Sequence, residues 1–214
     1  MEAIVNVTPD WGIGFENRLL VAIPEDLRRF RALTTGKTVI LGRKTLETFP
    51  GGKPLKNRRN LVLSADPTFH PEGAETVRSR EELFALLRTL DTQTLCVIGG
   101  ESVYRMLLPY CARVRLTRTF CDLRADRFFP NLDAMENWSH ETESEMLECD
   151  GVRYQFADYA NCTPLPLSAK PAGKGLRASR LSKKSVIVKI DSQFNEFLLS
   201  GFHLQKSGIP NFIV

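Results

Sequence analysis

The sequence predicts an α/β fold with three layers, a mostly parallel central sheet and an antiparallel hairpin at the C-terminal edge of that sheet. Two observations predict it. Through residue 120, short apolar runs typical of strands alternate with segments of helical periodicity, which is the pattern of βαβ units with helices on both faces. From residue 141 to 159, two strand-like runs instead flank Asp150 and Gly151, a dipeptide typical of hairpin turns.

The chain opens with a strand, a loop and a helix. Residues 3–7 are an apolar run, and residues 9–17 are too polar and too rich in turn-forming residues to continue it as a strand. Pro24 suits the first turn of a helix, because an amide hydrogen at that position has no partner within the helix. Apolar side chains recur at helical spacing from 27 to 33, until residues 34–36 end the helix.

The later elements are predicted from the same two patterns, short apolar runs for strands and helical spacing of apolar residues for helices. Ser79 and Glu82 have the spacing of a capping box, which marks the start of a helix. The predicted order is strand 38–41, helix 43–49, strand 60–64, a helix opening at residues 79–82 and running to 90, strand 95–98, a helix after Gly99-Gly100, and strand 114–120.

The chain of 214 residues is long enough for one packed domain and an appendage. After residue 161 the composition shifts to proline, serine, glycine and lysine, which favours a linker that buries no core. Residues 162–214 hold eight of the 29 basic side chains and two of the 25 acidic ones, so residues 1–161 carry a net charge of −2. We therefore predict a domain over residues 1–161 and a basic linker with a C-terminal extension of unknown role over residues 162–214.

Several classes of protein are disfavoured by composition. The five cysteines are widely spaced without a C-x-x-C pair, and the three histidines are scattered, so neither a disulfide framework nor a metal site is predicted. No apolar run approaches the ~20 residues of a membrane helix, and the first residues lack the pattern of a secretory signal. We expect a cytoplasmic protein without membrane contact, and the overall charge gives little support to nucleic-acid binding because it belongs to the extension.

Two strand-to-helix junctions carry residues suited to phosphate groups. Residues 42–45 (GRKT) combine a helix start, whose free amides favour an anion, with two cationic side chains that suit a monoester phosphate. The alternative is an ordinary solvated basic helix start. In residues 98–101 (IGGE), two glycines without Cβ atoms lie where a buried strand meets a helix. Their lack of side chains permits close approach of a ligand to the backbone. A tight turn alone is the alternative explanation of the two glycines.

Asp26 is the candidate acidic residue. It lies in the first turn of the helix predicted after Pro24, beside Leu27 and on the face that Phe30 shares, so its carboxylate is directed toward apolar surroundings. A carboxylate in such a place needs hydrogen-bond donors, and a nitrogen heterocycle with an amidine-like edge supplies two. Stabilisation of the helix dipole is the alternative role, and it explains Glu25 better than Asp26.

These features occur in an order that resembles the dihydrofolate reductase family over residues 1–161. The resemblance rests on the following segments: WGIG at 11–14, IPEDLRRF at 23–30, VILGRKT at 39–45, RRN at 58–60, IGG at 98–100, LT at 116–117 and DRFFP at 126–130. It implies NADPH-dependent reduction of 7,8-dihydrofolate to tetrahydrofolate for one-carbon metabolism, by hydride transfer to C6 and protonation of N5. It also implies a monomer that binds antifolate inhibitors.

The resemblance also implies the roles of particular residues. Asp26, bonded to Thr117, would grip the pterin, and the residue range 9–22 would act as a lid. The substrate site would be formed by Ile4, Asp26, Leu27, Phe30, Leu55, Arg58, Ile98 and Thr117. The cofactor site would be formed by Asn6, Ile13, Leu19, Gly42, Arg43, Lys44, Thr45, Ser64, Gly99, Gly100, Glu101, Ser102, Val103 and Tyr104.

The sequence departs from the family pattern at a few positions. Leu20 and Val21 stand where many relatives have Pro-Trp, so an indole donor that could orient a water is absent. Asn6 replaces a small residue, and Ser102 replaces an arginine of some relatives. Two rival functions remain: a riboflavin-pathway reductase with the same fold and cofactor, and a non-catalytic nucleotide- or nucleic-acid-binding module that uses the basic tail.

Overall fold

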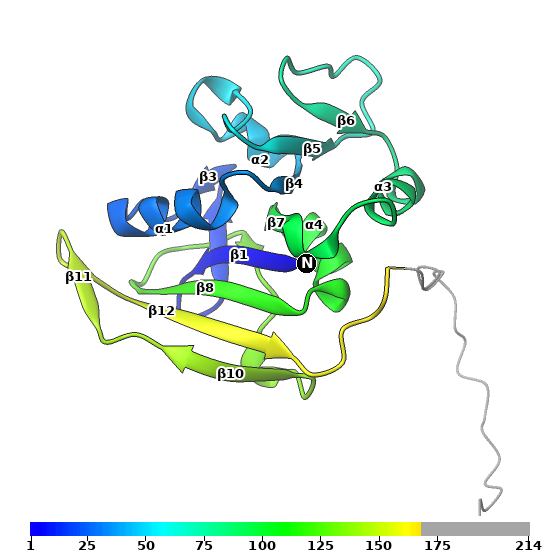
Figure 1. Ribbon diagram of the computed structural model, residues 1–214. Coiled ribbons are helices and arrows are strands. Elements are labelled where there is room, and N and C mark those ends of the chain that lie inside the picture. The colour runs from blue at the N-terminus through cyan, green and yellow to red at the C-terminus, as the bar shows by residue number, and fades with distance from the viewer. Residues whose placement is uncertain (168–214) are drawn as a thin grey trace, which may run out of the picture. The chain divides into compact units, whose positions relative to one another are not determined.

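The computed structural model describes residues 1–167, which fold into a central sheet with helices on both sides (Figure 1). Within this range the sheet has nine strands, of which β11 (Leu147–Cys149) pairs only with β12. The other strands lie in the spatial order β10 (Trp138–Glu143), β12 (Val152–Asn161), β8 (Arg113–Phe120), β1 (Glu2–Val7), β7 (Leu95–Gly99), β4 (Thr38–Gly42), β5 (Arg59–Leu63) and β6 (Glu75–Val77).

The strands from β8 to β6 are parallel, and the C-terminal strands are antiparallel. β1 pairs in parallel with β7 and β8, whereas β12 runs antiparallel to β8, β10 and β11. The β11–β12 hairpin turns at Asp150 and Gly151, whose φ angles of 49° and 76° suit a tight hairpin turn. The predicted parallel sheet with an antiparallel C-terminal hairpin is thereby confirmed.

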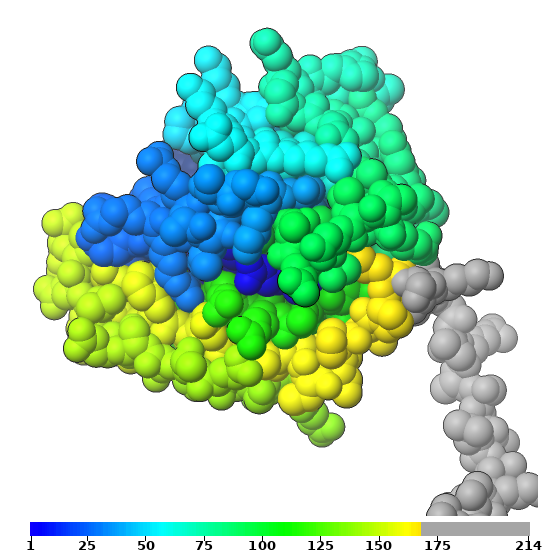
Figure 2. All heavy atoms as spheres, viewed as in Figure 1, coloured from blue at the N-terminus to red at the C-terminus, as the bar shows by residue number. Residues whose placement is uncertain are grey.

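Helices cover both faces of the sheet. One apolar cluster joins alternate side chains of β1, β4 and β7 to α3 (Arg80–Leu87) and α4 (Glu101–Leu107). A second cluster joins apolar side chains on the other face of these strands to α1 (Pro24–Thr34) and α2 (Arg43–Glu47). In the space-filling view, α1 in blue forms a continuous surface with the cyan and yellow-green segments beside it (Figure 2). The three-layer prediction is therefore correct.

The prediction of a loop over residues 9–17 is wrong. This segment contains β2 (Gly12–Phe15), which forms a hairpin with β3 (Arg18–Leu19) and also pairs with β9 (Arg127–Phe128) in a separate small sheet. The turn consists of Glu16 and Asn17, both with positive φ. Because β9 lies more than 100 residues away, no local pattern indicates this pairing.

Other elements differ from the prediction mainly at their ends. β6 was not predicted, since three residues at a sheet edge are too few to establish a period. The helices predicted over 43–49 and to residue 90 end at Glu47 and Leu87. Ser79 caps α3 by accepting a hydrogen bond from the Glu82 amide (3.1 Å), while the Glu82 carboxylate accepts from the amide of Arg78 (2.6 Å).

A cluster of ion pairs, here called the Glu2 cluster, ties the sheet to α1. Glu2 pairs with Lys37 (2.7 Å) and Arg115 (3.2 Å), and Asp158 of β12 pairs with Arg115 (2.5 Å) and with Arg29 of α1 (2.9 Å). Burial by itself raises the pKa of Glu2, but the hydrogen bonds and charges of its two partners outweigh this effect and lower the pKa below the ordinary value of 4.5. The cluster therefore favours ionised Glu2 in the folded protein.

No helix in residues 1–167 is both long and apolar enough to cross a membrane. Over the same residues, His, Cys, Asp and Glu side chains do not gather in groups that could hold a metal ion. The five cysteines are unpaired, and Cys96 and Cys111 are buried. The basic extension predicted over 162–214 lies almost wholly outside the described residues.

Candidate active site

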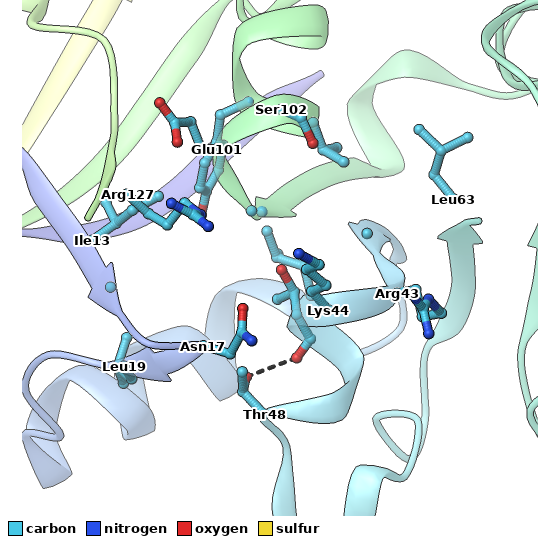
Figure 3. A pocket seen from close by; sticks show the side chains of 18 of the residues that line it. Ile13, Asn17, Leu19, Arg43, Lys44, Thr48, Leu63, Glu101, Ser102 and Arg127 are labelled. Carbon is cyan, nitrogen blue, oxygen red and sulfur yellow. Dashed lines mark hydrogen bonds between the residues drawn. The ribbon is translucent and has the colours of Figure 1, made fainter. Parts of the chain in front are cut away.

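A cavity of about 570 Å³ lies at the ends of four neighbouring strands of the central sheet. β1, β4, β5 and β7 contribute their last residues or those directly after them, and the first turns of α2 and α4 form an adjoining wall. The β2–β3 hairpin and Arg127 of β9 line the rest of the cavity (Figure 3). The carboxyl ends of parallel strands are where open α/β sheets bind ligands.

The starts of α2 and α4 are suited to anions. Gly42 and Gly100 are the N-cap residues of these helices and provide no side-chain cap, so the amides of both first turns lack a side-chain acceptor. Arg43 and Lys44 add two cationic side chains at the start of α2, and Ser102 of α4 lies across from them (Figure 3). The cavity thus has anion-binding features at two of its walls.

Glycine is favoured where β7 meets α4. Gly99 has a φ of 112°, and a Cβ atom there would lie 3.0 Å from the ring of Tyr104. The Gly99-Gly100 peptide bond is cis, and a Cβ atom on Gly100 would lie 3.1 Å from Thr45 Oγ1. Tyr104 donates a hydrogen bond from its hydroxyl to the Ile4 carbonyl (2.6 Å), and burial raises the pKa of the phenol. Tyr104 therefore stays protonated and structural at neutral pH.

The structure brings all the sequence-assigned cofactor residues to this one cavity. They are Asn6, Ile13, Leu19, Gly42, Arg43, Lys44, Thr45, Ser64, Gly99, Gly100, Glu101, Ser102, Val103 and Tyr104. Sequence reasoning missed several further lining residues, among them Asn17, Thr48, Asp66 and Arg127. Asn17 and Thr48 are close in sequence to assigned residues, whereas Arg127 reaches the cavity only because β9 pairs with β2.

Asp26 is held by two side chains from the strand β1 and its neighbour β8. Thr117 donates a hydrogen bond to Asp26 Oδ1 (2.6 Å), and the amide of Asn6 donates to Oδ2 (3.3 Å). Thr117 is buried, whereas Asp26 is partly exposed. Asn6 also lines the cavity, so this hydrogen bond connects Asp26 to it, although Asp26 is not itself a lining residue. A carboxylate has about four acceptor positions, so two remain for a ligand with two N–H groups.

Most apolar residues assigned to the substrate lie together. Ile4 and Ile98 belong to the second apolar cluster, and Phe30 and Leu55 pack against it. Leu27 differs from these residues, because it is 51% exposed and lies outside the cluster. The cluster forms an apolar wall that includes Phe30, one helical turn after Asp26.

Arg58 is fixed at the C-terminal end of α1. Its guanidinium group donates to Thr34 Oγ1 (2.8 Å) and to the carbonyl oxygens of Arg31 (3.2 Å) and Lys56 (2.6 Å). Burial, with a smaller effect of the nearby Arg31 charge, lowers the pKa of Arg58, but the group remains cationic. Arg58 is thus a pre-oriented cation near Leu55, where an anionic group of a ligand would be neutralised.

The predicted lid, residues 9–22, is attached to the segment before β9. The amide of Glu16 donates to Asp126 Oδ2 (3.2 Å), and the amide of Asp126 donates to the carbonyl of Gly14 (3.0 Å). Ile13 and Leu19 from this segment face the cavity (Figure 3). The segment therefore forms a wall of the site through pairing with β9.

Comparisons with known proteins agree with this geometry. A family model described as dihydrofolate reductase matches residues 1–161. Dihydrofolate reductase of Mycobacterium leprae (strain TN) is 38% identical over 151 residues, which cover 69% of this chain and 89% of the relative. Dihydrofolate reductase of Neisseria meningitidis serogroup B (strain ATCC BAA-335 / MC58) is 36% identical over 147 residues, with the same coverages of 69% and 89%.

A solved structure gives the same result for the fold. It is dihydrofolate reductase from Enterococcus faecalis complexed with NADP(H) and RAB-propyl, and it matches with a TM-score of 0.66 and 29% identity. The match covers 75% of this chain and 95% of that structure. The resemblance seen in the sequence is confirmed, and the chain belongs to the dihydrofolate reductase family.

Proposed function

We propose that the protein reduces 7,8-dihydrofolate to 5,6,7,8-tetrahydrofolate with NADPH, and that Asp26 and Thr117 are its catalytic pair. The observation that carries this proposal is the Asp26 carboxylate, which accepts hydrogen bonds from buried Thr117 and from Asn6, a residue that lines the large cavity. Family membership supports the reaction and favours dihydrofolate over the substrate of a riboflavin-pathway reductase.

Asp26 binds the pterin edge in this proposal. Its two remaining acceptor positions receive the N–H groups of the 2-amino group and of the neighbouring ring nitrogen, which fixes the ring in one orientation. Ile4, Phe30, Leu55 and Ile98, together with Leu27 at the surface, wall the pterin and benzoyl groups and exclude water. Arg58 pairs with a carboxylate of the glutamate tail, for which its guanidinium group is already oriented.

The cavity fits NADPH, which supplies the hydride for C6 of the substrate when bound. Gly99 and Gly100 support this fit, since both line the cavity without a side chain and leave the backbone open to close approach of a ligand. The uncapped first turns of α2 and α4 are suited to the pyrophosphate, and Arg43 and Lys44 to the monoester phosphate that distinguishes NADPH from NADH. The proton for N5 comes from water, and the ionised Asp26 stabilises the positive charge that develops on the ring.

The first test is the replacement of Asp26 by asparagine. The initial rate of NADPH oxidation with dihydrofolate should fall by about 10²–10⁴-fold at neutral pH, because the charge that stabilises the protonated transition state is lost. Glu25→Gln is the matched control, since it removes a neighbouring charge that pairs with Arg28 on the surface, and it should retain normal rates. Normal rates in folded Asp26→Asn protein would contradict the proposal.

The second test concerns the cofactor. Arg43→Ala should raise the KM for NADPH by about 10-fold or more and leave the KM for NADH nearly unchanged, because a charge-assisted hydrogen bond to the extra phosphate is lost. Lys53→Ala is the control, since Lys53 is exposed and lies outside the cavity. Equal changes for both cofactors would show that Arg43 does not contact the distinguishing phosphate.

Further proposals follow from the same assignment. We propose a cytoplasmic monomer that supplies tetrahydrofolate for one-carbon metabolism and binds antifolate inhibitors. The unpaired cysteines fit a reducing compartment. We also propose that residues 1–161 form the reductase domain and that residues 162–214 are an extension with a separate role, which deletion of that segment followed by the same assay would test.

A further inference from the structure

Asn6 lies between Asp26 and Thr119 and forms a hydrogen bond with each of them. Its Nδ2 atom donates to Asp26 Oδ2 (3.3 Å), and its Oδ1 atom accepts a hydrogen bond from Thr119 Oγ1 (2.7 Å). Asn6 and Thr119 come from the adjacent strands β1 and β8, and Thr119 is fully buried. A short relay of hydrogen bonds thus runs from Thr119 through Asn6 to the carboxylate.

The relay has one consistent set of donors and acceptors. An ionised carboxylate only accepts hydrogen bonds, so Asn6 must present its amide nitrogen to Asp26. Its amide oxygen then faces Thr119, whose hydroxyl must donate. Thr119 therefore anchors the oxygen end of the Asn6 amide while the nitrogen end faces the carboxylate, and Thr119 does not itself line the cavity.

We propose that Asn6 is a positioning residue for folate binding, which acts by fixing the plane of the Asp26 carboxylate with Thr119 as its support. The χ2 torsion of aspartate has a broad energy minimum, so one donor on Oδ1 alone leaves the plane loosely defined. With Thr117 on one oxygen and Asn6 on the other, each oxygen keeps one free acceptor position. Two parallel acceptors match two neighbouring N–H groups on a ring edge.

The inference rests on the proposed function and assigns Asn6 a different role from the one implied by family resemblance. Asn6 lines the cavity, so a cofactor contact is the competing role. The two roles have different consequences. A cofactor contact predicts weaker binding of NADPH, whereas a positioning role predicts weaker binding of folate in the absence of any cofactor.

The experiment compares Asn6→Ala, Thr119→Val and the double variant in the full chain. Isothermal titration calorimetry with folate alone should give a Kd about 10-fold higher for Asn6→Ala, the lower end of the range for a hydrogen bond to a charged group, because 3.3 Å is long. The kcat/KM for dihydrofolate should fall by a similar factor, and the KM for NADPH should change by less than about 2-fold.

Thr119→Val separates the two roles because it removes a hydroxyl group outside the cavity. Thr119→Val should also raise the Kd for folate. The Kd of the double variant should equal that of Asn6→Ala, since Thr119 acts through Asn6. Thr38→Val is the matched control, because it is also a buried threonine in a strand but lies at the start of β4. Its Kd for folate should equal that of the wild type.

The possible outcomes are distinct. Unchanged folate affinity in Asn6→Ala, an increase confined to the KM for NADPH, or additive effects in the double variant would overturn the positioning role. Loss of folate binding and activity in Asp26→Asn, combined with normal values in Asn6→Ala, would leave the proposed function standing without this inference. Absence of dihydrofolate reduction by the wild type would reject the proposed function itself.

Discussion

Replacement of Gly99 by alanine tests a tight contact at the cavity wall. The new Cβ atom would lie 3.0 Å from Tyr104 Cε2 and 3.3 Å from Cζ and the hydroxyl oxygen. Tyr104 has little freedom to move away. Its hydroxyl donates a hydrogen bond to the Ile4 carbonyl, and its ring packs edge-on against the ring of Phe129, with the two ring centroids 4.8 Å apart. We therefore expect the backbone between β7 and α4 to shift or the Tyr104 hydrogen bond to break.

The expected loss of unfolding free energy in Gly99→Ala has two parts. A residue with a Cβ atom at a φ of 112° costs about 1–2 kcal/mol in backbone conformation. Overpacking against a fixed aromatic ring adds about 1–3 kcal/mol. Gly36→Ala is the matched control, because Gly36 also has a positive φ, of 79°, but a Cβ atom there meets no atom within 4 Å. Gly36→Ala should therefore cost only the backbone part.

Urea unfolding followed by circular dichroism measures both variants. The free energy of unfolding should fall by about 2–5 kcal/mol in Gly99→Ala and by about 1–2 kcal/mol in Gly36→Ala. Gly99→Ala should also weaken NADPH binding, since the altered segment lines the cavity. Equal destabilisation of the two variants would refute the reasoning, because Tyr104 would then have accommodated the new methyl group without cost.

Two further predictions concern ionisable groups whose pKa values are shifted in the folded protein. Because the pKa of Glu2 is lowered in the folded protein, its ionised form stabilises the fold above the unfolded value of 4.5, and this contribution is lost as the pH falls through the folded value. The difference in unfolding free energy between wild type and Glu2→Gln should therefore be largest at neutral pH and should shrink below pH 4.5. Denaturant titrations at several pH values measure this difference, and a constant difference would contradict the prediction. Burial raises the pKa of Cys96 and that of Cys111 each to about 12, so iodoacetamide at mildly alkaline pH should alkylate exposed Cys162 and spare both, as peptide mass spectrometry will show.

Local sequence patterns were sufficient for the main elements and for the two strand-to-helix junctions suited to phosphate, whereas the other expected cofactor residues were implied only by the family resemblance. Period-two and period-3.6 patterns reflect contacts with the sheet or with neighbouring turns, so they predict β4, α1 or β7 without knowledge of the remaining chain. Gly42, Arg43 and Gly99 could be assigned to one site for the same reason. Each lies at a strand-to-helix junction, and the carboxyl ends of parallel strands meet at one edge of the sheet.

Tertiary structure alone decided the arrangements that depend on pairing between distant segments. β2 becomes a strand because β9 and β3 lie beside it, and its own sequence of four residues, two of them glycine, is too short to indicate a strand. Asn6 meets Asp26 because β1 and β8 pair in a register that sets Asn6 opposite Thr117, and α1 crosses the same region. Such contacts are fixed by the energy of the whole sheet, since a shift of one residue would turn every side chain of β1 to the opposite face.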